Sequence, residues 1–250
     1  MIKLVINPRY SEMEDFIVNL PYTFLQTGEV IYSGRNIIKT FNVGKFKVNI
    51  KGFRKPIWIN QLVYATFRPS KAKRSYRYAM RLKELGFNTP DPIAYLEQKK
   101  MLMLKYSLYV SIHENVDGML RELQHGTLNE KKELIRQFAL FTATLHENKV
   151  LHLDYSSGNI LYKVTEGKYT FYLVDLNRMT FDKTINIEKA CFNFRRLWGS
   201  DEMIAYFVTE YAKARKFDVG KCLRSTFKYR KQFWERFTEQ HPGSTPYIAE

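Results

Sequence analysis

The sequence predicts an α+β fold with two lobes, a small β-rich N-terminal lobe over residues 1–112 and a helical C-terminal lobe over residues 113–250. Short segments rich in β-branched and aromatic residues dominate the first half, whereas apolar residues recur at helical spacing in the second half. The 250 residues, 45% of them hydrophobic, fit one large domain or two lobes around a cleft. We expect the lobe boundary between about Ile112 and Asn115.

Three strand-like segments near the N-terminus are Glu29–Tyr32, Asn36–Phe41 and Lys45–Lys51. The intervening residues, Ser33-Gly34-Arg35 and Asn42-Val43-Gly44, carry the glycine or asparagine that tight hairpins use. These segments therefore predict an antiparallel meander.

Two helices are expected around this meander. Before it, the spacing of Ser11 and Glu14 is typical of a capping box, which predicts a helix from Met13 to about Asn19 that ends before Pro21. After it, residues 70–85 predict a second helix, stopped by the glycine and prolines that follow.

The remaining elements lead into a helical C-terminal half. Two strands are expected at Tyr95–Lys105 and Ser107–Ile112. From Thr127-x-x-Glu130 onward, apolar residues at helical spacing predict a long buried helix: Leu134, Phe138, Phe141 and Leu145. From about Asn186 the chain is expected to be mostly helical.

The segment directly after the long helix carries the clearest chemical signal. His152-x-Asp154, with Asn159 five residues on and Asp175 at the end of an apolar strand, has the pattern of a phosphoryl-transfer loop. Asp154 would accept the proton of an attacking hydroxyl, Asn159 and Asp175 would hold Mg²⁺, and His152 would pack the loop. The alternative is a solvated turn, since these residue types are common turn formers.

The charge predicts attraction to an anionic partner. Forty Lys and Arg against 25 Asp and Glu leave +15, which fits nucleic acid, phosphorylated ligands or an acidic membrane face, or simply solvated basic surfaces. The basic residues concentrate in five segments: 45–55, 68–83, 195–196, 213–216 and 228–231.

Two cysteines without metal-site spacing suggest neither a disulfide scaffold nor a zinc site. No apolar run is long enough to span a membrane, and the N-terminus lacks the regions of a signal peptide.

At these residues the sequence resembles the protein-kinase-like superfamily and, more closely, the lipopolysaccharide core kinases that phosphorylate heptose or Kdo (3-deoxy-D-manno-octulosonic acid). The resemblance covers most of the chain. It is carried by residues 33–36, 48–51, 70–74, 85–90, 152–161, 174–178 and 194–197.

The resemblance implies ATP and Mg²⁺ as cofactors and assigns three further residues. Lys51 would reach the α- and β-phosphates of ATP. The alternative is that Lys51 is a solvated lysine at the end of its strand. Gly34 would let the first hairpin lie close over the phosphates. Arg178 would orient an acidic sugar or brace the loop.

The sequence also departs from the protein-kinase pattern. The helix position that usually carries the glutamate paired with the strand lysine aligns with Ser75, so Lys51 would be held by Glu84, Glu97 or Asp175. Leu176-Asn177 replace the usual Phe-Gly, and Leu153 replaces the arginine that docks an activation-loop phosphate. Both changes favour a constitutively formed small-molecule or glycan kinase.

The leading hypothesis is therefore an ATP-dependent sugar kinase that phosphorylates lipopolysaccharide inner core, most simply a Kdo residue of a lipid A precursor. The alternatives are a kinase for a soluble metabolite or a protein, and a pseudokinase binding module. We expect lipopolysaccharide precursor and an anionic membrane surface as partners, and no nucleic acid. The expected location is the cytoplasm, peripheral on the cytoplasmic face of the inner membrane.

Overall fold

The computed structural model describes residues 2–53, 69–100 and 103–242, and its contacts divide the chain into two compact units. The first unit spans Met1–Asn115 and the second Val116–Glu250. The division therefore falls close to the predicted boundary.

The first unit is built on a six-stranded antiparallel sheet with the order β1-β5-β6-β4-β3-β2. The strands are β1 (Ile2–Ile6), β2 (Glu29–Ser33), β3 (Asn36–Val43), β4 (Phe46–Phe53), β5 (Pro92–Lys100) and β6 (Met103–Ile112). The predicted meander is present as β2, β3 and β4. The prediction of one strand over Tyr95–Lys105 was wrong in its bounds, because residues 98–105 contain no Gly, Pro, Asn or Asp to signal an interruption.

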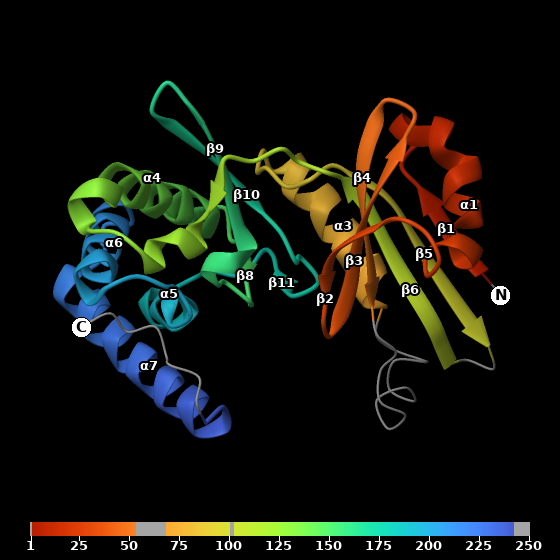
Figure 1. Cartoon of the computed structure of the whole chain (residues 1–250). Coiled ribbons are helices and arrows are strands. Elements are labelled where there is room, and N and C mark those ends of the chain that lie inside the picture. Colours follow the sequence, from red (N-terminus) through yellow and green to blue (C-terminus); the bar gives the residue numbers. More distant parts are fainter. Residues whose placement is uncertain (1, 54–68, 101–102, 243–250) are drawn as a thin grey trace. The chain divides into compact units, whose positions relative to one another are not determined.

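Two helices cover opposite faces of this sheet (Figure 1). Helix α1 (Glu14–Thr23) packs Ile17 and Leu20 into a core with Val48, Ile50 and other apolar strand residues. Helix α3 (Lys71–Glu84) lies on the other face, where the Tyr76 ring contacts that of Tyr95 at 5.5 Å between centroids. Ser70 caps α3 by accepting a hydrogen bond from the Lys73 backbone N–H, so the predicted second helix is confirmed.

The cap and the end of the first helix were predicted wrongly, whereas its predicted start at Met13 lies one residue from the observed start at Glu14. A 3₁₀ helix, η1 (Pro8–Met13), precedes α1 and is capped by Asn7, so Ser11 and Glu14 form no capping box. The helix also continues through Pro21 to Thr23. A proline inside a helix removes one backbone hydrogen bond. Burial of Leu20 and Phe24 on either side of Pro21 favours continuation.

The second unit joins helices to two small sheets (Figure 1). The sheets contain β7 (Gly118–Met119), β9 (Ile160–Thr165) and β10 (Lys168–Leu173) in one, and β8 (Leu151–His152) and β11 (Met179–Thr180) in the other. The helices are η2 (Leu120–Gln124), α4 (Leu128–Glu147), η3 (Ser157–Asn159), α5 (Ile187–Phe194), α6 (Asp201–Ala214) and α7 (Val219–Gln240). The predicted capping box of Thr127 and Glu130 is present at the start of α4.

An aromatic core holds the second unit together. Phe138 of α4 stacks on Phe207 of α6 at 4.9 Å between ring centroids, and Phe194 of α5 contacts Tyr211 of α6 at 4.8 Å. Phe171 of β10 joins the same core through Phe138. The last turn of α4 is buried in this core through Leu145 and His146, so the start of the segment that follows α4 is held in place.

Two predicted basic positions, Lys55 and Arg68, lie outside the described residues. Within the described part of the chain, no helix combines the length and apolar character needed to cross a bilayer.

Candidate active site

The loop after α4 is anchored by two side chains that follow Asp154. Tyr155 is buried, with its hydroxyl 2.8 Å from the Thr142 hydroxyl, and the Ser157 hydroxyl accepts a hydrogen bond of 2.8 Å from the Trp198 backbone N–H. Asp154 itself keeps 19% of its side chain exposed. The loop therefore keeps the Asp154 carboxylate partly exposed, while Tyr155 and Ser157 point into the protein.

His152 joins this loop to the end of β10. Its ring is buried, its Nε2 lies 3.0 Å from the Val174 carbonyl oxygen, and its Nδ1 accepts a hydrogen bond of 3.1 Å from the Asp154 backbone N–H. Burial lowers the pKa of His152, which favours the neutral ring with its proton on Nε2. The geometry matches the packing role predicted for this residue.

Asn159 and Asp175 are brought together by the same pair of segments. The Asn159 Nδ2 donates to the Asp154 backbone oxygen at 2.9 Å, which leaves its side-chain oxygen directed away from that bond. The Val174 N–H donates to the Asn159 backbone oxygen at 3.0 Å. Asp175 follows with a φ of 56°, a left-handed conformation that few non-glycine residues adopt and that turns its carboxylate off the strand direction.

This donor set fits Mg²⁺. The ion prefers oxygen ligands in octahedral geometry and is usually held by one or two carboxylates together with water and substrate phosphates. The Asn159 amide oxygen and the Asp175 carboxylate supply such oxygens from adjacent backbone positions. Among the described residues there is no cluster of three or more His, Cys, Asp or Glu side chains, and this mode of binding needs none.

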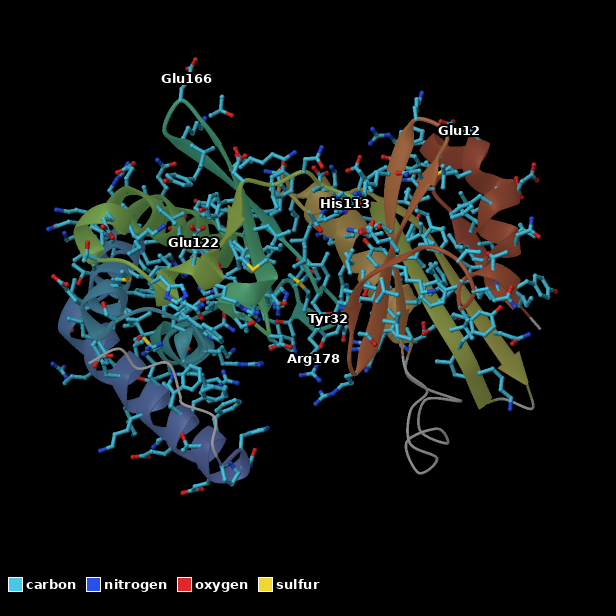
Figure 2. All side chains as sticks on the ribbon, in the orientation of Figure 1. Glu12, Tyr32, His113, Glu122, Glu166 and Arg178 are labelled. Carbon is cyan, nitrogen blue, oxygen red and sulfur yellow. The ribbon has the colours of Figure 1, made fainter. Side chains whose placement is uncertain are left out.

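Two arginines face the Asp154 carboxylate. Arg196 forms an ion pair with its Oδ1, and the Arg178 Nη1 lies 3.9 Å from its Oδ2. Arg178 immediately precedes β11 (Figure 2), and its backbone oxygen accepts a hydrogen bond of 2.8 Å from the Leu153 N–H. Sequence reasoning singled out Arg178 but placed Arg196 only in a basic cluster and a family motif. No local spacing connects Arg196 to Asp154, because the contact is made through the tertiary fold.

Lys51 and two of its candidate acids, Glu84 and Glu97, lie in the first unit, whereas Asp175 belongs to the second. Tyr109 of β6 pairs with both Lys51 of β4 and Tyr95 of β5, which places these side chains on the α3 face of the sheet. Two residues along each strand, Ser107 of β6 pairs with both Phe53 and Glu97, so these residues also point to the α3 face.

The candidate acids differ in burial. Glu97 is only 5% exposed, whereas Glu84 is exposed at the end of α3 and pairs with Arg81. The Lys51 Nζ lies 5.5 Å from the centre of the Phe53 ring. Phe53 and Glu97 both pair with Ser107, so the Lys51 ammonium extends toward the cross-strand positions that include Glu97. Ser75 is buried on α3, so no acid occupies that helix position.

Gly34 lies in the β2–β3 turn, where its N–H donates to the Asn36 carbonyl oxygen at 3.1 Å. It lines a cavity of about 440 Å³ that is bordered by Phe24, Gly52 and Leu108. Gly52 and Leu108 pair on the α1 face of the sheet, where Phe24 at the end of α1 packs, and this face is opposite the one that carries Lys51. The assignment of Gly34 to ATP phosphates stays a prediction.

One predicted basic cluster is interrupted. Lys228 and Lys231 are exposed on α7, but Arg230 is only 3% exposed and its guanidinium donates to the Leu197 carbonyl oxygen. Burial lowers the pKa of Arg230 to about 10. Arg230 therefore cannot serve as a surface contact without a change in packing.

Comparison with known proteins shows the family of this chain. The profile of the lipopolysaccharide kinase (Kdo/WaaP) family matches residues 34–239. The chain belongs to this family. The resemblance predicted from the sequence is thereby confirmed.

The relatives include two 3-deoxy-D-manno-octulosonic acid kinases. One, from Haemophilus influenzae (strain PittGG), is 27% identical over 117 residues, which cover 46% of this chain and 48% of the relative. The other, from Vibrio vulnificus (strain YJ016), is 26% identical over 151 residues, which cover 58% of this chain and 62% of the relative. The matches thus span about half to three fifths of these relatives.

A solved structure described as WaaP in complex with acyl carrier protein shares the fold. It superposes with a TM-score of 0.60 at 14% sequence identity, covering 95% of this chain and 98% of that one. The predicted α+β, kinase-like fold is confirmed.

Proposed function

We propose that this protein is an ATP-dependent kinase that phosphorylates a sugar hydroxyl of the lipopolysaccharide inner core, with a Kdo residue as the acceptor. The observation that carries the proposal is the constellation of Asp154, Asn159 and Asp175, joined by hydrogen bonds through Asp154 and Val174 in a member of a lipopolysaccharide kinase family. A binding module has no need of this combination.

In the proposed reaction, the acceptor hydroxyl oxygen attacks the γ-phosphorus of ATP and the bond to the bridging oxygen of ADP breaks. Asp154 orients the hydroxyl and accepts its proton. Asn159 and Asp175 would hold Mg²⁺, which would neutralise charge on the phosphates.

We assign residues 1–112 to an ATP-binding lobe, in which Gly34 and Lys51 contact phosphates, and residues 113–250 to the catalytic lobe. Glu97 is the best placed of the predicted acids within the first unit to hold Lys51, because it is buried on the same sheet face. A buried carboxylate is costly unless it is paired. The backbone of Glu97 lies two strands from Phe53, roughly 10 Å, within the combined reach of lysine and glutamate side chains.

The net charge of +15 supports an anionic acceptor held at a membrane. We propose a cytoplasmic protein that attaches peripherally to the inner membrane, where lipid A precursor is its partner.

The function is tested by mass spectrometry of the lipid A and core fraction from cells that lack the gene, carry it, or carry its Asp154→Ala variant. The expected result is one additional phosphate on the core sugar only with the wild-type gene. If the fraction is identical in all three strains while purified protein phosphorylates a soluble metabolite, the soluble-substrate alternative replaces the proposal.

A further inference from the structure

The Asp154 carboxylate is engaged on both of its oxygens. Arg196 is ion-paired with Oδ1, and the Arg178 Nη1 lies 3.9 Å from Oδ2. A general base must come within about 2.6–3.2 Å of the oxygen that carries the proton it accepts. An acceptor hydroxyl therefore has to compete with guanidinium groups for the same carboxylate oxygens.

Arg196 is supported by an aromatic ring. The Arg196 guanidinium carbon lies 5.6 Å from the centre of the Phe233 ring of α7. Stacking on a ring fixes the guanidinium plane and leaves its N–H edge available for a bidentate contact. Arg196 and Arg178 remain 33% and 51% exposed, so a ligand from solvent can reach both.

We propose that Arg196 and Arg178 form the binding site for a carboxylate of the acceptor, and that Asp154 occupies this site until the acceptor arrives. The planar guanidinium fork matches a carboxylate in geometry and charge. When the acceptor carboxylate takes over these contacts, an Asp154 oxygen becomes available to the acceptor hydroxyl. The acid group of the substrate thereby releases the base that its own hydroxyl requires. This inference rests on the proposed function, because it concerns the acid group of the proposed sugar.

The test compares a Kdo-bearing lipid A precursor with its carboxyl methyl ester as acceptors for the wild type and two variants. Arg196→Gln removes the proposed contact, and Arg195→Gln removes the neighbouring arginine, which lies over the Phe192 ring at 3.7 Å. The wild type should prefer the acid by about 10- to 100-fold in kcat/KM, as expected for a hydrogen bond to a charged group. Arg196→Gln should bring this ratio close to one, and Arg195→Gln should keep it.

A purely positioning role for Arg196 gives a different result. In that case Arg196→Gln lowers kcat for both acceptors and leaves their ratio unchanged, which overturns the inference while the kinase activity itself stands. Thermal unfolding shows whether Arg196→Gln folds. If it does not fold, Arg196→Lys replaces it in the test; this variant keeps the charge and should give an intermediate ratio.

The same assay separates a carboxylate from a phosphate ligand. A precursor with its carboxylate but without its lipid A phosphates should be used as well as the intact one. If Arg196→Gln erases a preference for the phosphates and not for the carboxylate, the carboxylate assignment is wrong. Absence of transfer by the wild type to every one of these acceptors would overturn both the inference and the proposed function.

Discussion

The Asp154 loop in the second unit and the Lys51 strand in the first are specified in different ways. In the loop, His152, Asn159 and Val174 are linked by hydrogen bonds between two segments that are close in sequence, and the chemical groups sit at fixed spacing. The placement of Lys51 depends on the register of three strands, and its proposed partner Glu97 comes from a distant one. A sequence motif can therefore identify the first region, but only strand pairing can identify the second.

The largest loss should come from the Asp154 side chain. Asp154→Ala removes the proposed general base, and kcat should fall by about 10²–10⁴-fold. Binding of MgATP should be spared, because Asn159 is anchored by the backbone oxygen of Asp154, which the substitution keeps. Steady-state kinetics together with ATP titration check this. More than about a tenth of wild-type kcat would contradict the general-base assignment.

Asp175→Ala should abolish transfer as well but should also weaken nucleotide binding. A bound metal contributes several kcal/mol of charge stabilisation, so a loss of at least about 100-fold in kcat/KM is expected. The weakening should be seen with MgATP and be much smaller with ATP in EDTA. Equal affinities of wild type and variant for MgATP would exclude Asp175 as a metal ligand.

Lys51→Met tests the register-dependent region. Loss of an ammonium contact to phosphates should raise the KM for ATP or lower kcat by about 10- to 100-fold. Lys47→Met is the matched control, because Lys47 lies on the same strand and face but is exposed. Equal effects of the two substitutions would show that the lysine has been assigned to the wrong position.

These contrasts also explain what the sequence could predict. The loop, the long helix with its capping box and the meander follow local rules of spacing and turn chemistry, and the structure contains them. The contact of Arg196 with Asp154 was not predictable, because α5 and the tertiary fold bring the two residues together. The continuation of α1 through Pro21 was missed for a similar reason, since burial of the residues around the proline outweighs its local effect.

A smaller effect is expected from the acid proposed to hold Lys51. Glu97→Gln keeps the side-chain volume and removes the charge, so the KM for ATP should rise by about tenfold, equivalent to ~1.4 kcal/mol. Glu84→Gln is the control, because Glu84 is exposed and pairs with Arg81. The free energy of unfolding of both variants, measured in urea, separates loss of function from loss of packing. If only Glu84→Gln affects the KM, Glu97 is not the partner of Lys51.

Membrane attachment is expected to depend on exposed basic residues. The protein should sediment with anionic vesicles and not with zwitterionic ones, and salt should release it as the Debye length falls from ~10 Å at 0.1 M to ~3 Å at 1 M. Lys228→Glu combined with Lys231→Glu tests α7 as the contact, with the buried Arg230 left unchanged. Since each basic residue near the surface contributes about 1 kcal/mol, this double reversal should weaken binding by roughly tenfold or more.

Lys132→Glu combined with Lys168→Glu makes the same charge change at exposed lysines elsewhere in the second unit and should have a smaller effect. Equal losses in both pairs would mean that net charge alone drives attachment, and no binding to either kind of vesicle would favour a soluble acceptor.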